Sequence, residues 1–154
     1  MKKATLLLAM LALLSATGCQ RADDVQPRSY DALALDTGHW EWESTTVGFG
    51  SHQTPSTVGF TRQLVFTTEG KVVIKHNKQF DKRTDYQLAM GTLAGCGDMQ
   101  PVPIITYETE ADIHSGNRKA YLVSKSGSEQ RLSITCDYAC VDGGAYESYH
   151  WVKE

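Results

Sequence analysis

Apolar and polar residues alternate with a period of two along most of the chain after residue 37. The stretch "GHWEWES", residues 38–44, places Trp40 and Trp42 on one face of an extended segment and its two glutamates on the other. Such alternation is typical of a strand with one buried and one solvent-facing side. The same period recurs in segments 60–67, 71–76, 85–91, 104–109, 119–124, 131–136 and 146–153.

Turn signals separate these segments. They include "TTEGK", "SKSGSEQ" and "DYACVDGG", which together contain four of the 13 glycines. No part of this region has a sustained helical period, so the pattern predicts an all-β domain with eight short antiparallel strands. An eight-stranded up-and-down barrel suits this count because closure removes the exposed edges of a sheet. A two-sheet β-sandwich is the alternative.

The first 18 residues have a different pattern, which is typical of a secretory signal peptide. Lys2 and Lys3 precede an apolar run at residues 4–14, and four small residues follow at 15–18. The run is too short to cross a bilayer, which requires ~20 apolar residues. We therefore expect residues 1–18 to be removed on export.

The end of this segment, "ATGC", resembles the lipobox of bacterial lipoproteins. The resemblance implies cleavage before Cys19 and attachment of acyl chains, such as palmitate, to its thiol and new amino group. Gln20 follows, and in Gram-negative lipoproteins this pattern resembles cargo of the outer membrane. Residues 19–36 would then form a lipidated tether, and residues 37–154 the barrel domain at the cell envelope.

The charge of the exported chain argues against nucleic acid as a partner. Removal of residues 1–18 takes away two of the 15 basic residues and none of the 18 acidic ones, so the formal charge falls from −3 to −5. An acidic surface repels phosphate backbones and anionic lipid. Membrane contact is therefore expected through the N-terminal lipid.

Two features of the domain resemble the lipocalin family. Gly38-x-Trp40 at the head of the first strand is similar to the lipocalin signature, in which the tryptophan closes the base of the barrel. Lys153, in phase with Trp151, is at the place of the basic residue that covers that ring. The resemblance therefore implies that Trp40 is buried and close to Lys153 or Trp151.

The chain is more closely similar to small lipocalin-like lipoproteins of Bacteroidetes-type bacteria. The segments that carry this resemblance are "WEWEST", "GFGSHQTPSTVGFTRQLVFTTEGK" and "CVDGGAYESYHW", and together they span about residues 37–154. The resemblance implies a calycin-type barrel and carries little information about the ligand.

Barrel topology indicates where a ligand would enter. Loops 45–59, 77–84, 109–118 and 137–145 share one end, because alternate loops of an up-and-down barrel lie together. Lipocalins place the long first loop over the open mouth. Phe49 and His52 in that loop, with Tyr138 and Asp142 in the last one, are therefore candidate mouth residues.

The three cysteines of the exported domain suggest one disulfide, since oxidising compartments favour such bonds. Cys96 lies between the fourth and fifth strands, at the opposite end from Cys136 and Cys140. The two ends are a strand length apart, ~17–20 Å, whereas a disulfide requires Cα atoms within ~7 Å. We expect Cys136 to pair with Cys140; two packed thiols are the alternative.

No catalytic or nucleotide-binding motif is present, so we expect neither enzymatic activity nor a cofactor. A copper site built from Cys136, Cys140 and His150 is an alternative to the disulfide, but no metal is expected. An eight-stranded barrel is just wide enough to hold one small ligand, so we expect binding of a small apolar or amphipathic molecule.

The alternative function is a filled barrel whose loops bind or inhibit an envelope or extracellular protein. Bulky residues in the expected interior favour a filled barrel. They are Phe60, Phe66, Tyr86, Met90, Tyr107, Tyr149 and Trp151.

Overall fold

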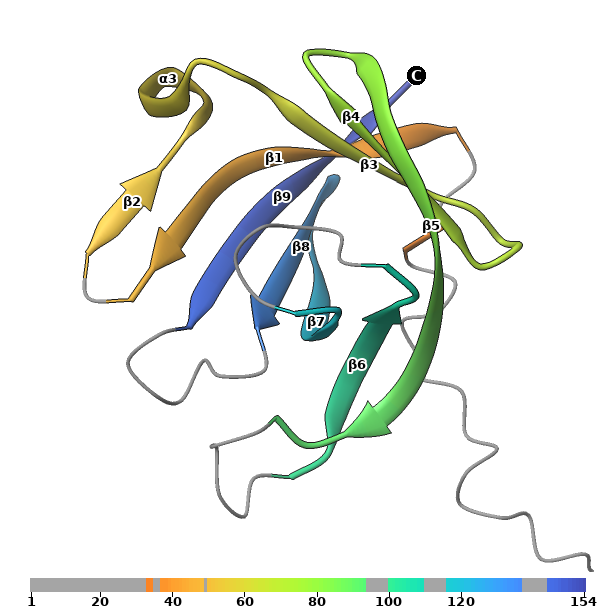
Figure 1. The fold of residues 1–154 in the computed structure, drawn as a ribbon. Helices are drawn as coiled ribbons and strands as arrows, with labels where there is room; N and C mark the ends of the chain where they lie inside the picture. Colours follow the sequence, from red (N-terminus) through yellow and green to blue (C-terminus); the bar gives the residue numbers. More distant parts are fainter. Residues whose placement is uncertain (1–32, 35–36, 49, 94–99, 110–115, 137–143) are drawn as a thin grey trace, which may run out of the picture.

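A single antiparallel sheet closes on itself to form a barrel (Figure 1). The computed structural model describes residues 33–34, 37–48, 50–93, 100–109, 116–136 and 144–154. The strands are β1 Gly38–Val47, β2 Ser51–Gln53, β3 Arg62–Phe66, β4 Lys71–His76, β5 Gln79–Gly91, β6 Val102–Tyr107, β7 Arg118–Ser126, β8 Glu129–Cys136 and β9 Ala145–Lys153.

Strand β1 closes the barrel because it pairs on both sides. It pairs with β9 from Gly38↔Lys153 to Val47↔Ala145, and with β3 at Trp40↔Leu64. From β3 to β9 each strand pairs with the next in sequence. β2 only extends the end of β1 and is followed by the short helix α3, Pro55–Val58. The predicted eight-stranded up-and-down barrel is therefore confirmed, and the β-sandwich is excluded.

The inward face of the barrel carries one continuous apolar cluster. Its members are no more than 5% exposed, so they fill the interior that they border. The cluster contains Leu33, Trp40, Trp42, Leu64, Phe66, Val72, Ile74, Tyr86, Ile105, Tyr107, Tyr121, Leu132, Ile134 and Tyr149.

The base of the barrel is built around Trp40, which is fully buried. Its ring meets Trp151 edge-on, with 5.2 Å between ring centroids, and its Nε1 donates a hydrogen bond of 2.9 Å to the carbonyl of Leu33. Gly38 is required here: its φ is 151°, and a Cβ atom would lie 2.2 Å from the Val152 carbonyl oxygen. Lys153 pairs with Gly38 in the ladder and is exposed.

A β-bulge at Glu43 redirects the second half of β1. Trp42 pairs with Tyr149, but the next pair is Ser44 with Ser148. Trp42 and Thr45, three residues apart, consequently both face inward, and the indole Nε1 donates to the Thr45 hydroxyl at 2.9 Å. The bulge therefore turns the Thr45 hydroxyl toward the interior, in the half of β1 that pairs with β2.

Some sequence-based assignments to the interior are wrong. Phe60 is 37% exposed and Met90 47%, although the sequence pattern places both in the interior. Leu122, an apolar residue of the alternating segment 119–124, is 62% exposed. In β7 the inward residue is Tyr121, because "AYLV" is apolar throughout and does not define which face is buried. Burial against β6 and β8 decides the phase instead.

The predicted loop 77–84 is also wrong in extent. Asn77 and Lys78 form a two-residue turn in which both φ angles are positive, 50° and 65°, and β5 begins at Gln79. Such a turn matches the twist of a hairpin. The Asn77 side chain also accepts a hydrogen bond from the Thr61 amide at 2.9 Å, which fixes the turn against the start of β3.

Candidate functional site

An interruption in the barrel wall produces an apolar groove. β6 and β7 share only three partner pairs, of which Ile104↔Ala120 is the last on the side toward Val102. Beyond it, β6 continues along β5, and β7 along β8. Pro103 has no amide N–H to donate, which is consistent with the end of pairing at this point.

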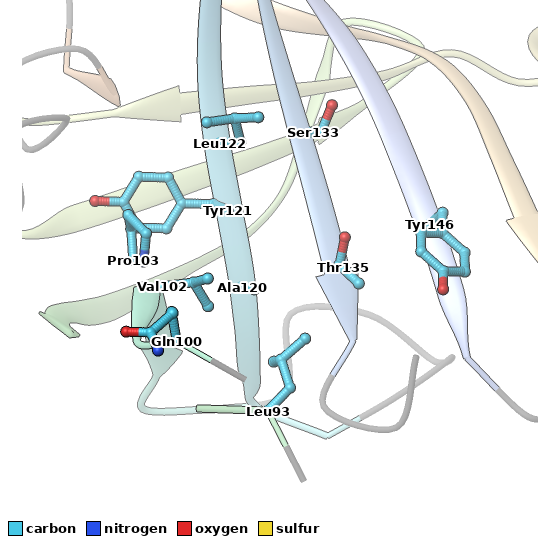
Figure 2. Close-up of a pocket in the computed structure, with 10 residues that line it drawn as sticks. All are labelled: Leu93, Gln100, Val102, Pro103, Ala120, Tyr121, Leu122, Ser133, Thr135 and Tyr146. Carbon is cyan, nitrogen blue, oxygen red and sulfur yellow. The ribbon is translucent and has the colours of Figure 1, made fainter. Parts of the chain in front are cut away.

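Small side chains on the outer face of β7 and β8 form the floor of the groove. Two cross-strand rows lie here: Ala120 pairs with Thr135, which pairs with Tyr146, and Leu122 pairs with Ser133. Figure 2 shows these residues on neighbouring strands, with Ser133 and Thr135 between Leu122 and Tyr146. Small residues therefore lie between large ones on this surface, which leaves room for the groove.

Residues of β6 and of the β5–β6 connection complete the lining. They are Leu93, Gln100, Val102 and Pro103, and the Tyr121 ring lines the same space from β7 (Figure 2). The volume is about 370 Å³, which is within the range of small-molecule sites, roughly 300–1,000 Å³. Leu122 and Tyr146, 62% and 50% exposed, form an accessible apolar rim. Chemically, the groove suits an apolar molecule.

A more polar depression of about 340 Å³ lies where β5 meets β6 and includes Asp85, Glu108 and Asn117. Asp85 forms an ion pair with Lys71. The hydrogen bond from Lys71 lowers the pKa of the Asp85 carboxyl below its usual value. This depression is open and hydrophilic, so it offers little surface to an apolar ligand.

Inside the barrel, one carboxylate holds a cluster of polar side chains. Glu147 Oε2 accepts from Arg62 Nη2 at 3.1 Å and from the Tyr149 hydroxyl. Its Oε1 lies 3.4 Å from Lys119 Nζ. The side chains of Lys119 and Glu147 are each only 4% exposed, and that of Arg62 is 10% exposed. We call these four residues the inner polar cluster.

Aromatic rings surround this cluster. The Arg62 guanidinium lies 5.1 Å from the Trp42 ring centroid and 5.5 Å from that of Tyr149, in cation–π contact. Phe60 stacks on Trp42 with 5.7 Å between centroids and covers it from the solvent side. Burial raises the pKa of the Tyr149 hydroxyl well above 10.0. Tyr149 is therefore neutral at physiological pH and acts as a donor to Glu147.

The inner polar cluster was missed at the level of sequence, although its signal is present. Arg62 is in phase with the inward residues Leu64 and Phe66, and Glu147 is in phase with Tyr149. A charged residue on the apolar phase of a strand is unusual, because an unpaired buried charge is very costly. Such ionic clusters are no more stable than well-packed apolar residues, which makes this cluster a candidate for function.

The predicted mouth residues are only partly described. His52 lies on β2, is exposed, and its Nδ1 is 3.2 Å from the Thr46 hydroxyl. Phe49, Tyr138 and Asp142 lie outside the described residues. His52 belongs to neither the groove nor the inner polar cluster, so the structure does not bring it to either candidate site.

Of the cysteines named in the predictions, only Cys136 lies within the described residues. Cys136 is buried, and its Sγ accepts a hydrogen bond from the Ala145 amide at 3.0 Å. Cys19, Cys96 and Cys140 lie outside the described residues, so lipidation and the Cys136–Cys140 disulfide remain predictions.

The described ranges contain no group of three or more His, Cys, Asp or Glu side chains that could hold a metal ion. Within the same ranges, no helix has the length and apolarity needed to cross a membrane. Comparison with protein-family models, curated proteins and solved structures finds no match.

Proposed function

We propose that this protein is a lipocalin-like lipoprotein of the bacterial cell envelope that binds a small apolar or amphipathic molecule. The observation that supports it most is the apolar groove in the wall, with its small-residue floor at Ala120 and Ser133 and its exposed rim at Leu122 and Tyr146. A concave apolar surface with a few polar groups, here Gln100 and the tyrosine hydroxyls, is the usual form of such a site.

We propose that the ligand binds in the groove of the barrel wall and not in the barrel interior. The residues of the core cluster are at most 5% exposed, so a ligand would have to displace them. The groove already offers about 370 Å³ without such displacement. Displacing a packed aromatic core would cost several kcal/mol, on the order of 3–5 for one large ring.

The proposed address rests on the sequence alone. A signal peptide at residues 1–18 and the "ATGC" element before Gln20 favour lipid attachment at Cys19 and the outer membrane. Several acyl chains give stable anchoring, where a single chain binds only marginally. The barrel would then lie close to the bilayer, which is a source of apolar ligands.

A second candidate function is that of an interaction or inhibitor protein. The filled interior favours it, as does the exposure of Leu122 and Tyr146 on a concave apolar surface. Exposed apolar grooves also serve as protein docking sites. The two functions differ in what occupies the groove, so one experiment separates them.

The experiment is a titration of the purified barrel domain with N-phenyl-1-naphthylamine, a neutral apolar dye. Leu122→Asp places a charge on the rim, and Ser133→Phe fills the floor; both side chains are exposed, so neither substitution should unfold the barrel. We expect each to weaken dye binding ~10-fold or more, equivalent to ~1.4 kcal/mol. Phe80→Asp is the matched control, since Phe80 is exposed but outside the groove.

Unchanged affinity in both groove variants would contradict the proposal, as would the absence of dye binding to the unmodified domain. In the second case, a partner protein retained by the unmodified domain and lost in Leu122→Asp would support the interaction function instead.

A further inference from the structure

Among the described residues, the lining of the apolar groove has no charged side chain. Most of the lining is aliphatic or contributed by two tyrosines, and the remaining members are Gln100, Ser133 and Thr135. A charged group that entered the groove would leave water without a partner of opposite charge in the lining, which is very unfavourable. The groove therefore favours an uncharged ligand.

The two arginines that neighbour the groove along its strands already have acceptors. Arg118, at the start of β7, donates from Nη2 to the Thr92 carbonyl at 2.8 Å. Arg131, two residues before Ser133 on β8, donates from Nη1 to Glu43 Oε2 at 3.0 Å. An anionic head group at either arginine would compete with an acceptor in place, and the net negative charge of the chain adds repulsion.

The carboxylate of Glu43 is equally engaged, so it does not favour a cationic head group. Ser148, the partner of Ser133 in the ladder, donates to Glu43 Oε2 at 3.1 Å. The other carboxylate oxygen, Oε1, lies 3.3 Å from His150 Nδ1. A cationic ligand would therefore compete with three side chains for one carboxylate.

Two hydroxyl groups on the floor of the groove have no hydrogen-bond partner among the described residues. Ser133 and Thr135 are two residues apart on β8, so both side chains lie on the outer face, roughly 6.5 Å apart along the strand. Water satisfies such accessible hydroxyls in the free protein. A ligand that covered them without offering a donor or acceptor would leave them unpaired, which opposes binding. The floor therefore favours a ligand with a polar group at this point.

We propose that the groove selects an uncharged amphipathic molecule, a neutral alcohol or ester, whose polar group hydrogen-bonds Ser133 and Thr135. Its apolar body lies against the rim formed by Leu122 and Tyr146. Gln100, on the other side of β7 in Figure 2, offers a further donor and acceptor. This inference rests on the proposed function of the groove and narrows it: fatty acids, phospholipids and amines are disfavoured because each carries a charge.

The test measures by calorimetry the binding of 1-octanol, octanoate and octylammonium to the purified barrel domain at neutral pH. The three molecules share one chain and differ in the charge of the head group. We expect 1-octanol to bind ~10-fold more tightly than either ion, because the lining offers neither ion a partner of opposite charge.

A double variant tests the two hydroxyls. Ser133→Ala with Thr135→Val removes both groups and nearly preserves the shape of the floor. We expect it to weaken the binding of 1-octanol ~5-fold or more, because two hydrogen bonds to the ligand are lost. Ser124→Ala, at an exposed serine of β7 outside the groove, is the matched control and should bind 1-octanol as the unmodified domain does.

Two results would overturn this inference. The first, measured on the unmodified domain, is binding of 1-octanol that is absent or no tighter than that of octanoate or octylammonium. The second is an unchanged affinity for 1-octanol in the double variant. Either result leaves the groove as a small-molecule site if the dye N-phenyl-1-naphthylamine binds there. Failure of the dye to bind the unmodified domain contradicts the groove function itself.

Discussion

Replacement of Trp40 by alanine tests how the barrel is closed at its base. The indole is 0% exposed, meets Trp151 at 5.2 Å and donates a 2.9 Å hydrogen bond to the Leu33 carbonyl. Deleting a buried aromatic side chain costs ~3–5 kcal/mol. The carbonyl of Leu33, itself buried, would also lose its partner, which costs ~1–3 kcal/mol. Because the two terms overlap, we expect a loss of ~4–5 kcal/mol, close to the whole stability of a marginal domain.

Urea unfolding followed by tryptophan fluorescence measures this loss. Trp40→Phe separates the two terms, since it keeps a ring against Trp151 but removes the N–H donor; it should cost ~1–3 kcal/mol. Phe80→Ala is the control, because Phe80 is 65% exposed, and it should change stability by less than ~0.5 kcal/mol. A loss below ~1 kcal/mol for Trp40→Ala, the size of an ordinary surface change, would refute the role given to the base.

Further predictions concern alkaline stability, lipidation and the cysteines. The raised pKa of Tyr149 keeps its hydroxyl protonated in the folded state at a pH where the unfolded chain ionises. The unfolding free energy should therefore fall as the pH rises above 10.0, and it should fall less steeply in Tyr149→Phe. An equal dependence of the unfolding free energy on pH in the two proteins would contradict this. Cys19→Ser should abolish acylation and membrane retention, and an acylated, membrane-bound variant would show that the lipoprotein assignment is wrong. Peptide mapping without reduction should yield a Cys136–Cys140 link; a peptide joining Cys96 to either residue would reject that pairing.

One premise of the disulfide prediction is weakened by the structure. Barrel topology predicts that Cys96 lies a strand length away from the other two cysteines. Leu93 and Gln100, the described residues on either side of the segment that contains Cys96, line the groove together with Thr135, the neighbour of Cys136. The distance between barrel ends therefore does not separate Leu93 and Gln100 from β8, and peptide mapping becomes the deciding observation.

The strands and their closure could be predicted from sequence because the period of two is local and repeated. Leu132 and Ile134 are buried as their phase predicts, as are Val72 and Ile74. The phase fails where apolar residues are consecutive: in "KAYLVS" the pattern fits either face. There the buried face is set by pairing with β6 and β8, which is a long-range property.

The inner polar cluster and the groove differ in how far each could be predicted from the sequence. Arg62 and Glu147 each lie on the apolar phase of a strand, so a search for charges in that phase would have found these two members of the inner polar cluster. The phase of Lys119 in "KAYLVS" cannot be read from the pattern. The convergence of Arg62 and Lys119 on one carboxylate depends on the register of three strands. The groove has a weaker signal, the prolines on either side of Val102, because its floor is assembled from side chains on separate strands.

Native mass spectrometry of the full-length protein, purified gently from its own membrane, tests the central claim most directly. We expect a small apolar or amphipathic molecule to co-purify, to be retained by Phe80→Asp and to be lost from Leu122→Asp. A protein that co-purifies in its place, or a small molecule retained equally by both variants, would contradict the assignment of the groove as a small-molecule site.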